Sequence, residues 1–328
     1  MFGQKKLRLA ALGAVGMLAL AGCGLQPATS TLPDLESGTI KPIDGAGDKK
    51  VTVTSKNFTE QLVLGKIAVL TAEAVGFDVT DMTNVPGSQP SRNLMVSGQA
   101  QLGWEYTGTA WLTYMGKDKA IPDAQEQWEA VKKEDAKNDL TWGKPAPLNN
   151  TYAFAVRQDF KDKYGVKTLE DIAKVPPEER SFCVESEFNS RSDGFNPMLE
   201  KYGLKRGAPD GVPEDKVSVM DTGTVYAATA KGDCNFGEVF TTDGRIPALN
   251  LTVLEDNREF FPKYNGSPVF NSDLVKEYPE LQDRFEQVSK LLDDKTMQDL
   301  NYQVDVEGKD PGDVAFDWMA DKGLVKKK

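Results

Sequence analysis

Histidine is absent from this 328-residue chain, which removes the commonest zinc ligand and the usual general base of proteins. Without histidine, neither a Ser-His-Asp triad nor a Cys-His nucleophile can be assembled. The chain also lacks a glycine-rich loop of the G-x-x-x-x-G-K-[ST] type for nucleotide phosphates. Carboxylate pairs could still support catalysis, as in a secreted hydrolase, but no pair of acids stands out by motif. The sequence therefore favours a protein that is not an enzyme and that uses no metal or cofactor.

Positive charge is scarce, with 39 Lys and Arg against 50 Asp and Glu. Three of the basic residues fall within the first 22 residues and none of the acidic ones do, so the remainder of the chain is near −14. Such an excess of negative charge argues against nucleic acid as a partner and against a surface that lies flat on anionic lipid.

A long hydrophobic run is also missing, because the apolar stretch near the N-terminus ends after about 14 residues, short of a membrane span. Lys5 and Arg8 precede this stretch, and the tetrad LAGC at residues 20–23 looks like a bacterial lipobox. We expect 1–22 to be a signal peptide and Cys23 to become lipidated, which would anchor the protein on the outer face of a bacterial cell membrane. The alternative is an ordinary secretory signal followed by a chance cysteine.

Residues 23–47 are rich in Gly, Pro, Ser, Thr and Asp and show almost no apolar periodicity. This composition predicts a flexible tether, with folding beginning near Lys50. About 280 residues remain, enough for two lobes or one large domain.

Cysteine is rare, and only Cys183 and Cys234 remain besides Cys23. In an exported chain these two favour one disulfide, because that compartment is oxidising. The bridge would close a loop of about 50 residues and contribute roughly 3–4 kcal/mol in the chain-entropy picture. Two separate buried thiols are the alternative.

The folded part alternates between strand and helix patterns. Residues 51–54 alternate as a strand, Asn57 or Thr59 can cap a helix over 62–74, and Gly76 can end it. A strand follows at once, which predicts a parallel crossover unit. Similar alternation continues along the chain and predicts an α/β protein with mainly parallel sheets.

Six short motifs then occur in order: SKNFTEQ, EYTGT, NTYAFAVR, EFNSRSDGF, FTTDGRI and FPKYNGSPV. In these the chain resembles the substrate-binding lipoproteins of ABC importers for osmoprotectants, which take up glycine betaine, choline, proline betaine or carnitine. The resemblance spans about residues 51–325.

The resemblance implies a type II periplasmic binding protein, in which two α/β lobes are joined by two crossover strands and ligand is trapped between them. It places lobe 1 at 48–150 plus 249–328 and lobe 2 at 151–248. It also implies a monomer that delivers its ligand to an ABC permease, with ATP hydrolysed by a separate subunit.

The same resemblance nominates a site. Its aromatic cage for a quaternary ammonium group would be Tyr106, Tyr152, Phe240 and Tyr264, and its ligand carboxylate would meet Lys56, Thr109 and Arg191. Aromatic ring faces attract a methylated ammonium, which has no N–H to donate, and Arg offers a carboxylate a bidentate fork. Gly108 would keep the backbone lean enough for ligand to approach.

Several residues have a plainer interpretation. Arg191 could only pair with Asp193, and Trp104 and Trp111 are expected in the core. The family commonly has Tyr where this chain has Phe240, so the same fold binding another small solute, such as an amino acid or an aromatic compound, is the nearest alternative. A purely structural surface lipoprotein is a further one.

Overall fold

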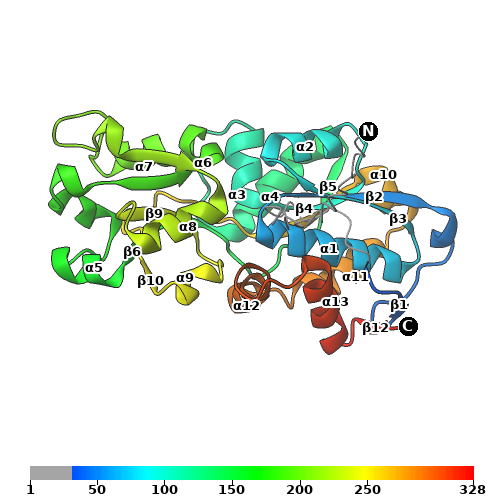
Figure 1. Ribbon diagram of the computed structural model, residues 1–328. Coiled ribbons are helices and arrows are strands. Elements are labelled where there is room, and N and C mark those ends of the chain that lie inside the picture. Colours follow the sequence, from blue (N-terminus) through cyan, green and yellow to red (C-terminus); the bar gives the residue numbers. More distant parts are fainter. Residues whose placement is uncertain (1–31) are drawn as a thin grey trace, which may run out of the picture.

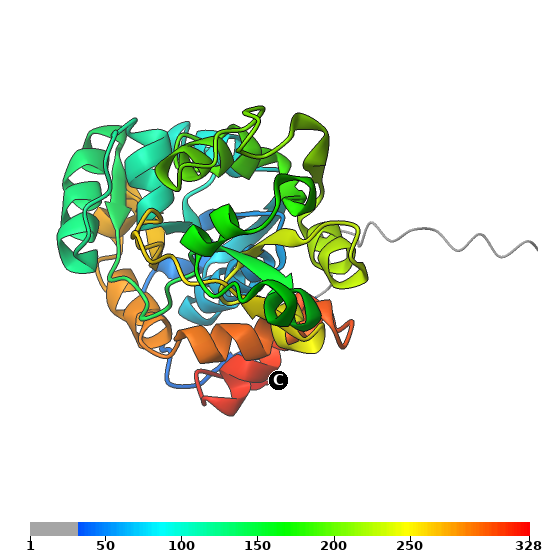
Figure 2. The same ribbon diagram turned by 90° about the vertical axis from the view of Figure 1, so that its left-hand side faces the viewer.

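The computed structural model describes residues 32–328 and has two lobes, each built around a five-stranded sheet (Figure 1). The predicted signal peptide, the lipobox and Cys23 lie outside the described residues. In Figure 1 the second lobe, in green and yellow, lies to the left of the first lobe, and Figure 2 views the molecule from that side. Within the described part, no helix is long and apolar enough to cross a membrane.

The first lobe's sheet has the strand order β3-β2-β4-β11-β5. Its strands are β2 (Lys50–Lys56), β3 (Asp78–Val85), β4 (Leu102–Tyr106), β5 (Leu140–Trp142) and β11 (Gly266–Asn271). β2 runs parallel to β3 and β4, as the predicted crossover requires, whereas β11 is antiparallel to both its neighbours.

The second lobe's sheet has the order β10-β6-β9-β7-β8. Its strands are β6 (Tyr152–Arg157), β7 (Phe182–Glu185), β8 (Val217–Met220), β9 (Phe236–Phe240) and β10 (Leu251–Val253). Two of its four pairings are antiparallel, as in the first sheet. The prediction of mainly parallel sheets was therefore wrong, because apolar periodicity identifies a strand but does not give the direction of its neighbour.

Helices cover both sheets. The α-helices are α1 (Thr59–Val75), α2 (Ser88–Val96), α3 (Thr107–Thr109), α4 (Ala124–Asp135), α5 (Gln158–Tyr164), α6 (Ser186–Ser190), α7 (Phe195–Lys201), α8 (Thr222–Lys231), α9 (Arg245–Ala248), α10 (Ser272–Glu277), α11 (Leu281–Ser289), α12 (Asp294–Asp305) and α13 (Pro311–Asp321). A π-helical turn, Ala110–Tyr114, continues α3, and short 3-10 turns cover Ala46–Asp48, Ala136–Asn138, Leu169–Lys174, Pro177–Glu179 and Glu214–Lys216.

Helix α1 is buried along almost its whole length, between the first sheet and helices α11, α12 and α13. A helix that is apolar on all sides belongs in a core, and Val63, Leu64 and Ile67 are fully buried. Gly76 ends α1 in the left-handed conformation, as predicted. The predicted cap was wrong, because the N-cap position is occupied by Phe58, whose side chain caps nothing.

Two connections join the lobes, at 143–151 and 254–265, and an isolated antiparallel bridge pairs Asn149 with Asn265. The implied lobe boundary at residue 248 falls too early in the chain. β10 follows that point and pairs with β6 in the second sheet, and Leu254 is buried in the second lobe's core.

The predicted tether is partly folded. Within 23–47, the structure describes residues from 32 onward, and strand β1 (Leu35–Ser37) pairs with β12 (Val325–Lys327) at the far end of the chain. Ile40 is fully buried in the first lobe's core. Scattered apolar residues gave no local period, so this packing depended on a partner strand nearly 290 residues away.

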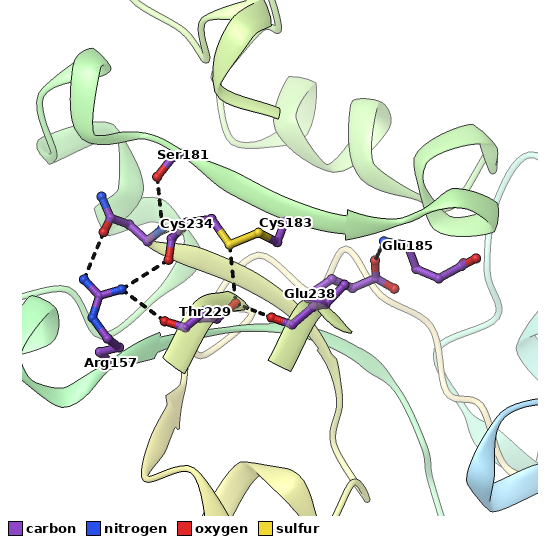
Figure 3. The surroundings of a disulfide bond; sticks show 9 residues. Arg157, Ser181, Cys183, Glu185, Thr229, Cys234 and Glu238 are labelled. Atoms are coloured by element: carbon purple, nitrogen blue, oxygen red, sulfur yellow. Dashed lines mark hydrogen bonds between the residues drawn. A yellow bond between two sulfur atoms is a disulfide. The ribbon is translucent and has the colours of Figure 1, made fainter. Parts of the chain in front are cut away.

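The predicted disulfide is confirmed, joining Cys183 on β7 to Cys234 just before β9, with the two Cα atoms 5.8 Å apart (Figure 3). Both cysteines are buried. The bond therefore reinforces two neighbouring parallel strands of the second sheet.

Candidate functional site

A cavity of about 560 Å³ lies between the lobes, within the size range of small-molecule sites. It is bordered by the ends of strands from both sheets. All seven side chains nominated from the sequence line it, namely Lys56, Tyr106, Thr109, Tyr152, Arg191, Phe240 and Tyr264.

The strand pairing explains why residues far apart in sequence meet here. Lys56 and Tyr106 are the last residues of β2 and β4, which are parallel neighbours, so their carboxyl ends share one edge of the first sheet. Tyr152 begins β6 and Phe240 ends β9, and antiparallel pairing sets these two residues directly opposite each other. Each sheet thus presents side chains from one edge to the same cleft.

The rings form a continuous aromatic wall. The Tyr152 ring centroid lies 5.3 Å from that of Phe240 and 5.5 Å from that of Tyr264, which stands edge-on to it. Phe58 bridges to the first lobe, with its ring 5.3 Å from Phe240 and 6.2 Å from Tyr106, stacked on both. Four rings were predicted at the cleft and five are present.

Sequence reasoning missed Phe58, although it lies within the quoted motif SKNFTEQ. Ser, Thr, Asp or Asn is preferred at the N-cap position that Phe58 occupies, but only the structure shows that the helix begins at this residue. An apolar ring at a helix start forgoes a capping hydrogen bond. Such a departure from local preference is typical of functional positions.

The structure explains the need for glycine at position 108 by packing against Tyr264 and not, as expected, by the approach of ligand. A methyl group on its Cα would lie 2.6 Å from the Tyr264 ring and 2.8 Å from the Lys263 carbonyl oxygen. Glycine is needed here so that the Tyr264 ring can pack against the backbone, which fixes that ring at the edge of the cleft.

The two cations nominated for a ligand carboxylate are already paired within the protein. The Lys56 ammonium lies 2.6 Å from Glu105 and 5.0 Å from the centre of the Tyr106 ring. Arg191 donates to both carboxylate oxygens of Asp193, at 2.7 and 2.6 Å, and a third donor lies 3.1 Å from Glu187. Arg191 therefore does pair with Asp193, as the alternative interpretation held. Its side chain also borders the cavity.

Two tyrosines of the aromatic wall donate hydrogen bonds from their hydroxyls to buried carboxylates. Tyr264 donates to Asp193 at 2.6 Å, and Tyr106 donates to Glu60 at 2.7 Å. Burial raises the pKa of Tyr106, Tyr152 and Tyr264 well above 10, so all three remain neutral donors at neutral pH.

Glu60, in the first turn of α1, was missed by sequence analysis, because an acidic residue there is usually just a favourable partner of the helix dipole. It is only 2% exposed and accepts hydrogen bonds from four side chains. The donors are Tyr106, Asn150 in a connecting segment, Thr242 after β9 and Asn301 on α12. Burial raises the pKa of Glu60, and the four donors lower it only in part.

Glu60 therefore links both lobes and the connection between them to Tyr106. A second contact lies beside it, where Asp305 on α12 accepts from Thr59 at 2.6 Å and lies 3.5 Å from Arg245 of the second lobe. Burial raises the pKa of Asp305 from 3.8 to about 6. Figure 1 shows α9, which carries Arg245, next to α12.

Trp104 is buried in the first core, as predicted, whereas Trp111 is only half-buried and its indole donates to the Lys119 carbonyl oxygen. Asp243 accepts hydrogen bonds from the backbone and side chain of Arg245. Residues 32–328 contain no cluster of three or more His, Cys, Asp or Glu that could bind a metal ion.

Residues 49–321 match the family described as the substrate-binding domain of ABC-type glycine betaine transport systems. The chain belongs to this family. A glycine-betaine-binding protein of Pseudomonas aeruginosa is 36% identical over 281 residues, covering 83% of this chain and 88% of that protein. The ergothioneine transport permease/ergothioneine binding protein EgtU of Helicobacter pylori is 31% identical, over 86% of this chain and 49% of that longer protein.

A solved structure agrees with the fold. The crystal structure of a glycine betaine/carnitine/choline ABC transporter protein has a TM-score of 0.67 and 28% identity, over 84% of this chain and 98% of that one. The fold is thus a type II periplasmic binding protein, as the resemblance implied. Members of this family bind a solute outside the cytoplasm for an ABC importer and catalyse no reaction.

Proposed function

We propose that this protein captures a quaternary ammonium osmoprotectant, such as glycine betaine, choline, proline betaine or carnitine, and delivers it to an ABC permease. The observation that carries the proposal is the convergence of aromatic rings from both lobes on one cleft. Tyr106 and Phe58 approach from the first lobe, Tyr152 and Phe240 from the second, and Tyr264 from the connection between them.

The chemistry of the ligand explains why rings suit it. A trimethylammonium group spreads its positive charge over methyl groups and has no hydrogen to donate, so an oxygen acceptor gains little from it. The negative face of an aromatic ring attracts such a cation by about 0.5–2 kcal/mol, with more attraction where water is excluded. Phe240 retains a ring face at the position where the family commonly has Tyr.

The carboxylate end of a betaine would meet Lys56, Thr109 and Arg191, which line the same cavity as the rings. Arg191 and Lys56 are held in place by Asp193 and Glu105, so little side-chain freedom is lost when ligand binds. Contacts to both lobes would favour the closed form, because ligand stabilises whichever state it binds better. The closed form is then what a permease could recognise.

The N-terminal part of the proposal rests on sequence alone. Cleavage after residue 22 and lipidation of Cys23 would hold the protein, as a monomer, at the outer face of the membrane beside its permease. Mass spectrometry of the protein extracted from membranes tests this, and a mature form that begins elsewhere than at a diacylated Cys23 would contradict it.

Titration calorimetry tests the ligand class. Glycine betaine, choline, proline betaine and carnitine are titrated into the purified chain, with glycine as the control, since it carries a carboxylate but no methyl groups on nitrogen. We expect saturable binding of at least one methylated ligand and none of glycine, whose hydrated ammonium would need acceptors that rings do not provide.

An amino acid or aromatic solute is the second candidate, favoured by the size of the cavity and by the charged groups that also line it, Glu185, Asp221 and Arg245. Ergothioneine joins the panel because one relative is named for it. No heat with any of the four osmoprotectants at millimolar concentration, together with heat from another solute, would replace the first candidate with the second.

A further inference from the structure

Glu187 forms a contact between the two lobes beside the cavity. It lies on α6 in the second lobe and borders the cavity. One carboxylate oxygen lies 3.1 Å from an Arg191 nitrogen. The other accepts, also at 3.1 Å, from the backbone N–H of Ser88, the first residue of α2 in the first lobe.

Glu187 is one of three carboxylates that line the cavity, with Glu185 and Asp221, and of these three it is the one in contact with Arg191. Each cation that lines the cavity has a carboxylate partner of its own: Lys56 with Glu105 at 2.6 Å, Arg191 with Asp193 at 2.6 Å, and Arg245 with Asp243 at 2.9 Å. Glu187 shares Arg191 with Asp193. Burial opposes its charge, but the Ser88 hydrogen bond and the nearby Lys56 and Arg191 lower its pKa, so it is ionised at neutral pH.

The two carboxylates divide the Arg191 guanidinium between them. Asp193 takes the edge formed by Nε and Nη2, and Glu187 takes Nη1. A ligand carboxylate that approached Arg191 would have to use the remaining hydrogens of Nη1 and Nη2, next to the Glu187 and Asp193 carboxylates. Glu187 would repel this carboxylate, while the same charge would attract the ammonium group of any ligand in the cage.

We propose that Glu187 determines how the cleft discriminates between quaternary ammonium ligands by net charge, favouring cations such as choline relative to zwitterions such as glycine betaine. This inference rests on the proposed function. Glu187 attracts the ammonium group of a cation such as choline and repels no part of it. In a zwitterion such as glycine betaine, Glu187 attracts the ammonium group but repels the carboxylate. The relevant quantity is the ratio of the two dissociation constants.

Glu187→Gln tests the inference, because it removes the charge but keeps the shape and an oxygen for the Ser88 N–H. We expect the affinity for choline to fall and that for glycine betaine to rise or stay constant. Their ratio should shift by about tenfold toward betaine, as expected for one unit charge several ångströms away at a protein surface. Both ligands are titrated calorimetrically at one fixed ionic strength.

Two further variants separate charge from structure. Glu187→Asp keeps the charge but shortens the reach to Ser88, so both ligands should weaken together and the ratio should stay that of the wild type. Glu178→Gln removes the same charge from an exposed position of the same lobe, outside the cleft, and should change neither ligand.

An unchanged ratio in Glu187→Gln, with wild-type binding intact, would overturn this inference alone. A ratio that shifts equally in Glu178→Gln would also overturn it, since long-range charge would then be the cause. If the wild type binds none of the four osmoprotectants, the proposed function fails and this inference fails with it.

Discussion

Replacing Tyr106 separates two roles that the structure gives to one side chain. Its ring faces the cleft beside Phe58, and its hydroxyl donates to the buried Glu60 at 2.7 Å. Tyr106→Ala removes both, whereas Tyr106→Phe removes only the hydroxyl. Comparing the two variants therefore assigns ligand affinity to the ring and stability to the hydrogen bond.

The expected sizes follow from burial. Tyr106 is 4% exposed, so truncation to Ala should cost about 3–5 kcal/mol of unfolding free energy. Loss of one ring face from the cage should weaken glycine betaine binding by about tenfold or more, since a ring contributes up to about 2 kcal/mol. Tyr106→Phe should cost about 1–3 kcal/mol, because Glu60 loses one of its four donors, and should change the dissociation constant by less than about threefold.

Urea unfolding measures the stability of each variant, and calorimetric titration measures its affinity for glycine betaine. A dissociation constant that is unchanged in Tyr106→Ala would remove this ring from the site. If Tyr106→Phe lost as much affinity as Tyr106→Ala, the link through Glu60 would matter instead of the ring face.

Three further predictions concern other parts of the molecule. Arg191→Ala should weaken glycine betaine about tenfold more than choline, which has no carboxylate; equal losses in calorimetry would mean that Arg191 only braces the fold. Replacing Cys183 and Cys234 together by Ala should cost about 2–5 kcal/mol in urea unfolding, and reducing agent should then no longer change the stability. The raised pKa of Asp305, about 6, means that its carboxyl prefers the protonated form in the folded state, so wild-type stability should fall as pH rises from 4 through 6. Asp305→Asn should lack this component and gain up to about 3 kcal/mol relative to wild type between pH 4 and pH 7; parallel stability profiles would contradict the assignment.

Local patterns in the sequence predicted much of the fold. Alternating apolar residues located β2, and Gly76 marked the end of α1 because a residue free of a side chain readily takes the left-handed conformation there. The compartment implied by the signal predicted the disulfide. The six motifs, which occur in the same order as in the family, nominated seven side chains that all line one cavity, although strand directions were not known.

Other features depended on contacts that no local pattern records. Which segments meet in space decides the strand directions within each sheet and the folding of residues 35–48. It also decides that β10 belongs to the second lobe, where it pairs with β6. Glu60 and Thr242 are 182 residues apart, and their hydrogen bond exists only because the chain crosses into the second lobe and the two lobes meet.

Sequence thus determined the elements, the family and the residue types available for binding, because backbone period, capping and short motifs act over a few neighbouring residues. Tertiary structure alone decided that Phe58 completes the aromatic wall, that Glu60 joins the lobes and that Glu187 contacts Arg191 beside the cavity. These roles depend on distances and on burial, because both set the strength of ring contacts and of interactions between charges. Neither can be read from the order of residues.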